Sequence, residues 1–408
     1  MNIGIFFMHP PGESMGSIFR VRSLCLGLTR LSHRCFVFTP FNYYENWGPL
    51  VTFISIPVVS SSSEIQKQIY KTARKILDLR NFSNFSILNP RFLDIIISRI
   101  SNGLLNIIKE KSMDLDVIIG ETEIGGLILT KIKNKLNCPI ITDYQNYWPE
   151  ELVEHKIIKR YGRRYKYLIE LEKKVINKSD MIFTVSDILR KFLLKNYSDL
   201  EESKIKTEII GSLPIFDKPR KKEFPPKIIN SGMVVHRSNF KYFFKSLPFV
   251  LKEYPETHIY VTKKGEKLKE TMKLAKKMKL NVNFYWKDTY QEFIELLSQC
   301  HVGIVTSTYE LTRRFGFVTK IYDYLSVGIP IVGNDIGGWI KIVEKEKLGL
   351  LSSKDPKDLA EKILFFINNP DMTYEYGERG IEFLKKRHNV KYSAQKIIDH
   401  IQNISHLK

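Results

Sequence analysis

One segment of the chain combines a carboxylate with bare backbone, a pairing that can bind hydroxyl groups and phosphates. Apolar residues recur at helical spacing after Lys320, and Gly328 stands where such a helix would end. A short apolar strand follows and leads into a loop that contains Gly337 and Gly338. The carboxylate of Asp323 could accept hydrogen bonds from hydroxyl groups, and the glycine loop at the carboxyl end of the strand could hold phosphates.

Two predicted helix starts could also bind anions. The backbone N–H groups of Thr319 and Lys320 begin the helix just described, where the helix dipole is positive and the N–H groups have no partner within the helix. We therefore expect them to bind a diphosphate. Gly16 follows the first predicted strand and precedes a helix. It marks a weaker candidate, because many doubly wound domains carry a glycine loop at this place.

Asp143 directly follows the predicted strand 139–142 and so lies at the carboxyl end of a sheet. Its carboxylate could bind a hydroxyl group of a substrate or order the loop in which it lies. A residue that only caps the turn gives the same sequence signal. Both interpretations of Asp143 stay open at this point.

Strands and helices alternate along the first half of the chain, which predicts a parallel sheet with helices on both faces. Ser186 follows the last of these strands and is expected to cap the next helix. The predicted strands are 3–8, 35–39, 50–56, 117–120, 139–142 and 180–185, and the predicted helices are 18–31, 65–79, 92–111 and one that begins near Gly125.

A proline-rich, charged stretch then interrupts the alternation and is typical of a linker or hinge. We expect a first domain at 1–211, a linker at 212–226 and a second domain at 227–389. The predicted strands of the second domain are 227–231, 257–262, 282–286 and 302–305, its predicted helices are 240–253, 268–278 and 290–299, and a final helix is expected at 392–404.

The segment 320–338 resembles the donor-site signature of the glycosyl transferases group 1, a large retaining group of GT-B glycosyltransferases also called family 4. The signature consists of a Glu-Tyr-Leu-Ala-x-Gly-x-Pro-Val-Val motif, a Gly-Gly loop and a later Gly-x-Leu, for which Gly349 is the match here. The resemblance implies two Rossmann-like domains that face each other across a cleft. The first would bind the acceptor and the second the donor, with residues 390–408 packing back on the first domain. A generic helix–turn–strand of a doubly wound sheet is the alternative.

The resemblance also implies roles for single residues. Relatives carry basic residues after the first strand of the second domain that neutralise the leaving diphosphate; Arg237 is the best match, followed by Lys241. Of the two glutamates that many relatives hold, Asp323 matches the one that binds the ribose. The glutamate that touches the donor sugar has no match, because Arg313 stands at its place and Glu310 is displaced.

The segment 143–150 resembles the family's Asp-x-His-Asp-x-Trp-Pro-Glu segment, which lies near the sugars. This chain has Gln145 in place of the histidine and Asn146 in place of the second aspartate. The candidate catalytic residues are Asp143 and Arg237, and the candidate donor-binding residues are Gly16, Arg237, Lys241, Thr319, Lys320, Asp323, Gly337 and Gly338.

At 408 residues the chain is long enough for two or three domains. Its composition is that of a globular protein, its apolar runs are too short to span a bilayer, and its first residues lack the basic region of a secretory signal. The four scattered cysteines lack metal-ligand spacing, which favours reduced, structural cysteines and a cytoplasmic location. We expect no metal site, and no cofactor besides the nucleotide sugar as co-substrate.

The net charge of +20 favours anionic partners. The basic residues are spread along the chain without a nucleic-acid-binding motif, so no nucleic acid partner is expected. Nine of them lie within 153–178 among aromatic and aliphatic side chains. A helix of this kind could lie on an anionic membrane surface; a solvated charged helix is the alternative.

We predict an α/β protein of the GT-B class: a metal-independent, retaining glycosyltransferase of the hexosyltransferase type. It would move a sugar from a nucleotide-diphosphate sugar to a hydroxyl acceptor by positioning and charge stabilisation. A lipid-linked acceptor or a precursor of a cell-surface glycan would place the enzyme at the cytoplasmic face of the membrane as a peripheral protein. The alternatives are another GT-B enzyme, such as a sugar-nucleotide epimerase or an inverting transferase, and a non-catalytic membrane or scaffold protein.

Overall fold

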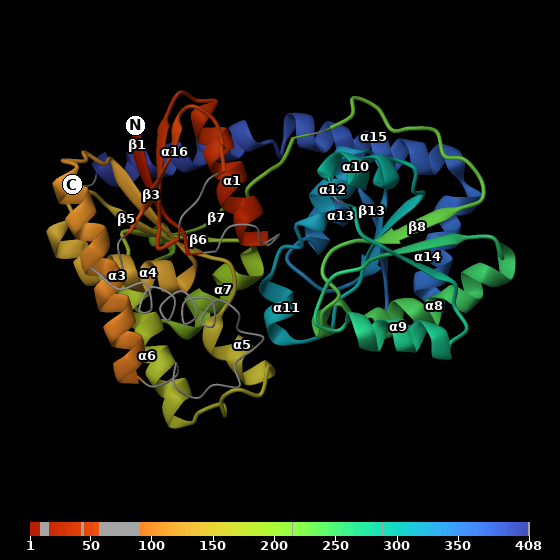
Figure 1. The fold of residues 1–408 in the computed structure, drawn as a ribbon, viewed down its shortest axis with the longest axis horizontal. Helices are drawn as coiled ribbons and strands as arrows, with labels where there is room; N and C mark the ends of the chain where they lie inside the picture. Colours follow the sequence, from red (N-terminus) through yellow and green to blue (C-terminus); the bar gives the residue numbers. More distant parts are fainter. Residues whose placement is uncertain (9–15, 42–44, 57–89, 214, 288, 407–408) are drawn as a thin grey trace. The chain divides into compact units, whose positions relative to one another are not determined.

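A computed structural model of the chain describes residues 1–8, 16–41, 45–56, 90–213, 215–287 and 289–406. The chain divides into two compact units. The N-terminal unit comprises Met1–Ile210 with Val390–Lys408, and the C-terminal unit comprises Gly211–Asn389. Each unit is built on a parallel sheet with helices around it (Figure 1), which confirms the predicted α/β class.

The described part of the N-terminal unit has a seven-stranded sheet in the order β3-β2-β1-β4-β5-β6-β7. Neighbouring strands are parallel throughout. Apolar side chains fill the central strands because helices cover both faces of the sheet. The strands are β1 (Asn2–Phe6), β2 (Arg34–Thr39), β3 (Val51–Ser55), β4 (Val117–Glu121), β5 (Ile140–Tyr144), β6 (Met181–Thr184) and β7 (Ile205–Thr207).

The last helix of the chain belongs to the N-terminal unit. From α16 (Val390–His406), Ile397 and Ile401 join the apolar core that contains Ile3 and Ile5 of β1. This packing confirms the predicted return of the C-terminal helix to the first domain. The other described helices of this unit are α1 (Gly16–Thr29), α3 (Pro90–Glu110), α4 (Thr122–Ile132), α5 (Trp148–Glu154), α6 (Arg163–Lys178) and α7 (Asp187–Asn196), the last of which is capped by Ser186 as predicted.

The described part of the C-terminal unit has a six-stranded parallel sheet in the order β10-β9-β8-β11-β12-β13. Its strands are β8 (Lys227–Asn230), β9 (His258–Thr262), β10 (Val282–Tyr285), β11 (Val302–Val305), β12 (Ile331–Asn334) and β13 (Gly349–Ser352). Its helices are α8 (Phe240–Glu253), α9 (Leu268–Lys277), α10 (Tyr290–Ser298), α11 (Leu311–Phe315), α12 (Lys320–Ser326), α13 (Ile340–Lys345), α14 (Pro356–Asn368) and α15 (Pro370–Lys386).

The turn after α12 has the geometry that the sequence predicts. Gly328 has a φ of +68°, a left-handed conformation that residues with a Cβ rarely adopt. The Ile329 N–H donates to the Tyr324 carbonyl at 3.0 Å and the Gly328 N–H donates to the Leu325 carbonyl at 3.2 Å. These two bonds form a Schellman C-cap, which ends the helix and lets β12 begin at Ile331.

Three differences from the sequence-based expectations lie in the N-terminal unit. The basic segment 153–178 is not one helix, because α5 and α6 are separated by a loop in which Lys156 and Tyr161 have positive φ. Helix α4 begins at Thr122 rather than near Gly125. Strand β7 is an addition, since three residues at a sheet edge leave no periodic pattern in the sequence. The predicted helix 65–79 lies outside the described residues.

Candidate functional site

The C-terminal unit offers a ligand site where its strand order changes direction. β9 and β10 lie on one side of β8, and β11, β12 and β13 lie on the other. Open α/β sheets bind ligands at the carboxyl ends of the strands at such a point, which here are the ends of β8 and β11. The chain leaves β8 through Ser231 and Gly232, and it leaves β11 through Thr306 and Ser307.

Lys320 directs its side chain to the loop after β8. Its Nζ donates to Asn230 Oδ1 at 2.9 Å. A Cβ placed on Gly232 would lie 3.1 Å from Lys320 Cε. Burial lowers the pKa of this ammonium group to about 8, while the charge of Asp323 opposes the shift. A bound anion would stabilise the charged form of the Lys320 side chain. The ammonium group of Lys320 could therefore bind an anion together with its backbone N–H group, which the sequence predicts to bind a diphosphate.

Asp323 lies three residues after Lys320 on α12, and its Oδ1 accepts a hydrogen bond from the Tyr290 hydroxyl at 3.0 Å. Burial raises the pKa of the Asp323 carboxyl group to about 6, while the Tyr290 hydrogen bond and the Lys320 charge oppose the rise. Tyr290 begins α10 and is 59% exposed. A half-buried carboxylate at such an edge can accept hydrogen bonds from neighbouring hydroxyl groups of a ligand.

Tyr324 fixes α12 against the loop after β8. Its side chain is fully buried, and its hydroxyl accepts from the Ser231 N–H at 3.0 Å and donates to the Ile304 carbonyl at 3.1 Å. The ring can pass over β11 because residue 303 is glycine; a Cβ there would lie 2.4 Å from a ring carbon of Tyr324. Lys320 and Asp323 are therefore carried by a helix that the core holds in one position.

The basic residues predicted to bind the diphosphate follow β8. Arg237 belongs to a 3₁₀ turn (His236–Ser238), and its carbonyl accepts from the Thr308 N–H at 3.1 Å. Lys241 is exposed in the first turn of α8. The turn thus ties the loop after β8 to the loop after β11, and it places Arg237 beside the ends of both strands.

One of the two N–H groups of the glycine loop after β12 is already bonded to the segment before α12. The Gly338 N–H donates to the Gly316 carbonyl at 3.0 Å, so it has no proton left for a phosphate. Gly337 has a φ of +128°, and a Cβ there would lie 2.4 Å from Trp339 Nε1. Thr319 is the N-cap residue of α12, and its carbonyl accepts from the Tyr322 N–H at 3.0 Å.

Asp143, in the N-terminal unit, has a structural partner. Its two oxygens accept from Nε and Nη2 of Arg20, each at 2.6 Å, and both side chains are buried. Arg20 Nη2 also donates to the Glu208 carbonyl at 2.8 Å. This bidentate ion pair gives Asp143 a structural role, and its predicted catalytic role stays a prediction. Gly16 begins α1 and is exposed, and residues 9–15 before it lie outside the described residues.

Two buried glutamates of the N-terminal unit belong to no motif that the sequence analysis identified. Glu172 Oε2 accepts from the Tyr144 hydroxyl at 2.6 Å, and Glu123 Oε1 has no hydrogen-bond partner among the described residues. Burial raises the pKa of Glu172 to about 8. Burial also raises the pKa of Glu123, and repulsion by Glu172 adds to that shift. Both are expected to be protonated at neutral pH, and only their burial identifies them.

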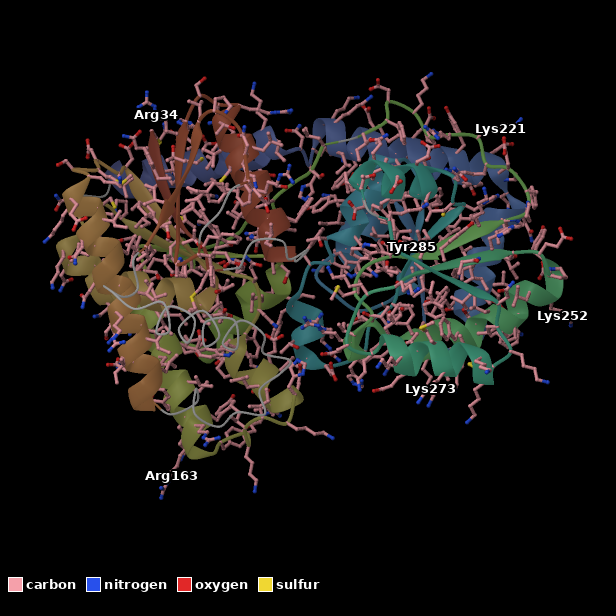
Figure 2. All side chains as sticks on the ribbon, in the orientation of Figure 1. Arg34, Arg163, Lys221, Lys252, Lys273 and Tyr285 are labelled. Carbon is pink, nitrogen blue, oxygen red and sulfur yellow. The ribbon has the colours of Figure 1, made fainter. Side chains whose placement is uncertain are left out.

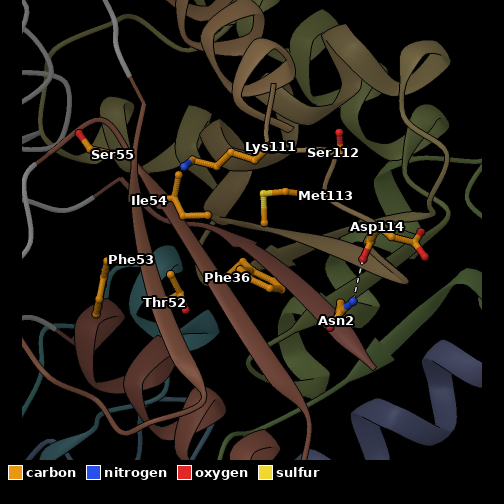
Figure 3. A pocket seen from close by; sticks show the side chains of 10 residues that line it. All are labelled: Asn2, Phe36, Thr52, Phe53, Ile54, Ser55, Lys111, Ser112, Met113 and Asp114. Atoms are coloured by element: carbon orange, nitrogen blue, oxygen red, sulfur yellow. Dashed lines mark hydrogen bonds between the residues drawn. The ribbon is translucent and has the colours of Figure 1, made fainter. Parts of the chain in front are cut away.

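A pocket of about 700 Å³ opens beside the edge strand β3 (Figure 3). Asn2 begins β1 and Asp114 precedes β4, so the pocket lies toward the amino ends of these strands. Parallel sheets bind their ligands at the opposite ends, and the pocket contains none of the candidate residues. It is lined by Asn2, Phe36, Thr52, Phe53, Ile54, Ser55, Lys111, Ser112, Met113 and Asp114.

No group of three or more His, Cys, Asp or Glu side chains in the described part of the chain is placed to hold a metal ion. Among the described helices, none is both long enough and apolar enough to cross a membrane.

Known proteins resemble this chain in sequence and in fold. Residues 190–383 match the family model described as glycosyl transferases group 1. An uncharacterised glycosyltransferase of Methanocaldococcus jannaschii is 31% identical over 107 residues, which are 26% of this chain and 29% of that protein. The chain therefore matches less than a third of that relative's length.

Solved structures of other proteins match the fold of this chain over nearly its whole length. Sucrose-phosphate synthase from Thermosynechococcus elongatus has a TM-score of 0.71 at 15% identity, over 100% of both chains. HepE of Anabaena, solved in complex with UDP-glucose, has a TM-score of 0.69 at 13% identity, over 99% of this chain and 100% of that one. At these identities the structural likeness establishes the fold alone.

Proposed function

We propose that the protein is a glycosyltransferase, because residues 190–383 match the family model of the glycosyl transferases group 1 and the chain has the GT-B fold. It would move a sugar from a nucleotide-diphosphate sugar to a hydroxyl acceptor. The observation that carries the proposal is the pairing on α12 of a half-buried cation, Lys320, with a half-buried carboxylate, Asp323. A diphosphate requires the first and a ribose the second.

The cation would act most strongly when the glycosidic bond breaks. Negative charge then develops on the leaving diphosphate, and the ammonium group of Lys320 with the guanidinium of Arg237 would stabilise it without a metal ion. The freed diphosphate would accept the proton of the acceptor hydroxyl on the same face of the sugar, which gives retention of the anomeric configuration. Positioning and charge stabilisation would thus supply the rate enhancement.

Donor turnover tests this proposal. The protein is incubated with UDP-glucose, UDP-galactose, GDP-mannose and ADP-glucose, and release of the nucleoside diphosphate is measured with and without simple sugar acceptors. We expect release with at least one donor, unchanged by EDTA, and strongly reduced in Lys320→Met and Asp323→Asn. Lys273→Met, on the exposed face of α9, is the matched control and should be fully active. A chain that turns over none of these donors contradicts the proposal.

Within the basic segment 153–178, we restrict the proposed membrane surface to residues 155–169, which we name the basic tip. The basic tip carries six basic residues and no acidic one. Tyr161, in the left-handed conformation, is 74% exposed within it. Figure 2 shows the side chain of Arg163 extending away from the ribbon. Beyond the tip, Lys173 is paired with Glu170 on α6 at 3.0 Å, so that part of the helix has mixed charge.

We propose that the basic tip binds an anionic membrane, with Tyr161 at the interface, and so brings the enzyme to a lipid-linked acceptor. Each basic residue near such a surface contributes about 1 kcal/mol. The triple variant Lys159→Gln, Arg163→Gln, Lys166→Gln should therefore bind phosphatidylglycerol vesicles about 3 kcal/mol more weakly at low salt.

The matched control removes three charges from α9 instead: Lys273→Gln, Lys276→Gln, Lys277→Gln. It should co-sediment with the vesicles as the unchanged protein does. If both triple variants lose vesicle binding equally, the net charge of the protein accounts for the binding and the basic tip has no special role. If the unchanged protein stays in the supernatant, the membrane proposal is wrong.

A further inference from the structure

We propose that the cavity beside β3 is a second ligand site and that it takes an amphiphilic anion, a short aliphatic or aromatic chain that ends in a phosphate or a carboxylate. The cavity measures about 700 Å³, and small-molecule sites usually measure about 300–1,000 Å³. It lies toward the amino ends of β1 and β4, in the N-terminal unit, so it is separate from the donor site. The inference does not rest on the proposed function.

The floor of the cavity is one face of the strands β2 and β3. Phe36 of β2 and Thr52 of β3 are register partners, and Ile54 lies two residues further along β3. Because side chains alternate along a strand, these three share one face of the sheet, and Figure 3 shows them around the cavity. Phe36 is half-buried and Ile54 is buried. An apolar chain laid on this floor would remove more of the Phe36 ring from water.

One wall of the cavity is the turn that ends α3. Ser112 has a φ of +44°, and its N–H donates to the Lys109 carbonyl at 3.0 Å. The Met113 N–H donates to the Ile108 carbonyl at 2.9 Å. These two bonds form a Schellman motif, which fixes the turn and places the half-buried side chain of Met113 at the cavity (Figure 3). A thioether is a soft side chain that adapts to apolar groups of different shapes.

The same turn is anchored to the first strand of the sheet. Asn2 Nδ2 donates to the Asp114 carbonyl at 2.9 Å, and the Asn2 N–H donates to Asp116 Oδ2 at 2.6 Å. The wall is therefore tied to the sheet that forms the floor. A ligand that enters a cavity fixed in this way loses little binding free energy to ordering the protein.

The two charged side chains of the cavity lie at opposite ends of it. Figure 3 shows the side chain of Lys111 extending toward Ile54, whereas Asp114 lies at the end near Asn2. Lys111 is exposed, and its ammonium group has no hydrogen bond or ion pair within the described part of the chain. The aliphatic stem of a lysine can cover apolar surface while its charge stays at the rim. An anionic head group therefore fits the Lys111 end, and a chain fits the floor.

A plain sugar and a free inorganic anion each fit the cavity less well. A sugar would place hydroxyl groups against Phe36, Ile54 and Met113, and hydroxyl groups buried without partners cost free energy. An inorganic anion could reach Lys111 but would leave the floor uncovered, and a single exposed cation binds an anion weakly. A ligand with both a chain and an anionic head group uses both features of the cavity.

Calorimetric titration of the full chain with hexyl phosphate, octyl phosphate, 1-octanol and inorganic phosphate, all below micelle-forming concentrations, tests the inference. Octyl phosphate should bind about tenfold more tightly than hexyl phosphate, because it buries two more CH₂ groups. Lys111→Gln should weaken octyl phosphate about three- to fivefold and leave 1-octanol unchanged. Thr52→Tyr fills the cavity with a residue that strands favour, and it should abolish the binding of both. Inorganic phosphate should not bind measurably.

Lys109→Gln is the matched control, because Lys109 is exposed in the last turn of α3 and does not line the cavity. It should bind octyl phosphate as the unchanged protein does. Equal weakening in Lys109→Gln and Lys111→Gln would overturn the inference, since net charge would then explain the binding. Full binding by a Thr52→Tyr variant with an unchanged melting temperature, or no binding of octyl phosphate by the unchanged protein, would also overturn it. If Thr52→Tyr does not fold, the comparison of the two lysine variants decides.

Co-sedimentation with phosphatidylglycerol vesicles then separates two sources of the same chemistry. Weaker sedimentation of Thr52→Tyr than of the unchanged protein would identify the ligand as a membrane lipid. Equal sedimentation, with octyl phosphate binding lost, would identify it as a soluble amphiphile.

Discussion

The two units of the chain place their charged side chains in opposite ways. In the described part of the C-terminal unit, no Asp, Glu, Lys or Arg is fully buried, and burial keeps the imidazole of His301 neutral by lowering its pKa to about 4. Two candidate site residues there, Lys320 and Asp323, are half-buried. The described part of the N-terminal unit instead buries one guanidinium and six carboxyl groups, of which those of Glu123 and Glu172 are expected to be protonated: Arg20, Glu121, Glu123, Asp143, Glu150, Glu172 and Glu208.

This difference indicates two uses of charge. A fully buried charge must find its partner inside the protein, as Asp143 finds Arg20, and it then supports the fold. A half-buried charge such as Lys320 keeps part of its interaction for a ligand. Substitutions of charged residues should therefore act on stability in the N-terminal unit and on binding in the C-terminal unit.

The largest expected effect is on stability, from Arg20→Met. Removing the guanidinium leaves the Asp143 carboxylate buried without its partner, which should lower the free energy of unfolding by about 3–5 kcal/mol. Urea denaturation measures the loss. In Arg20→Met with Asp143→Leu, which removes both charges, most of the loss should be recovered. A single variant as stable as the unchanged protein would show that this pair does not support the fold.

The next effect is on binding, from Asp323→Asn. Loss of a charged acceptor for the ribose hydroxyls should weaken nucleoside diphosphate binding by about 1.5–3 kcal/mol, which is roughly ten- to a hundredfold in Kd. The melting temperature should change much less than in Arg20→Met. An unchanged Kd in calorimetric titration would remove Asp323 from the site.

A smaller effect on stability is expected from Glu172→Gln, and it depends on pH. The pKa of Glu172 is raised from 4.5 to about 8 in the folded protein, so the folded state holds a proton that the unfolded state releases. This group makes the protein less stable as pH rises between those two values. Each pKa unit corresponds to about 1.4 kcal/mol, of which the new amide protons offset part, so the variant should gain about 1–2 kcal/mol at pH 8.

Denaturation of Glu172→Gln and of the unchanged protein at pH 5 and pH 8 checks this prediction. The stability advantage of the variant should be large at pH 8 and small at pH 5. A constant difference at both values would mean that Glu172 is ionised in the folded protein across this range.

The smallest effect is expected from Tyr290→Phe. Loss of the hydroxyl that holds Asp323 should weaken nucleotide binding by about 0.5–1.5 kcal/mol. The hydrogen bond from Tyr290 lowers the pKa of Asp323, so its loss should raise that pKa above about 6. Binding that needs the Asp323 carboxylate is lost as pH falls through its pKa, and this loss should begin at higher pH in the variant. An identical pH profile in both proteins would leave Tyr290 without a positioning role.

The sequence predicts the elements of this molecule better than the contacts between them. The bounds of α8 and β11 agree with the predicted helix 240–253 and strand 302–305, because apolar periodicity and turn residues are local signals. The break in the basic segment was missed because it depends on left-handed conformations at Lys156 and Tyr161, which are residues that seldom adopt them.

The site shows the same limit. The donor-site motif identified Asp323 and the turn at Gly328 within one continuous stretch. The partner of Asp143 is Arg20, 123 positions away, and the partner of Glu310 is His236 on another strand's loop. Pairings of this kind depend on the order of the strands in the sheet, which no local pattern encodes.

Calorimetric titration of UDP, GDP and ADP into the unchanged protein, Lys320→Met and Arg20→Met tests the central claim most directly. The claim is that the half-buried charges of α12 bind the nucleoside diphosphate, whereas the buried charges of the N-terminal unit only support the fold. We predict binding of at least one nucleotide, a loss of about tenfold or more in Lys320→Met, and a retained Kd in Arg20→Met under conditions where it is folded. Binding that is unchanged by Lys320→Met, or absent from the unchanged protein for all three nucleotides, would contradict it.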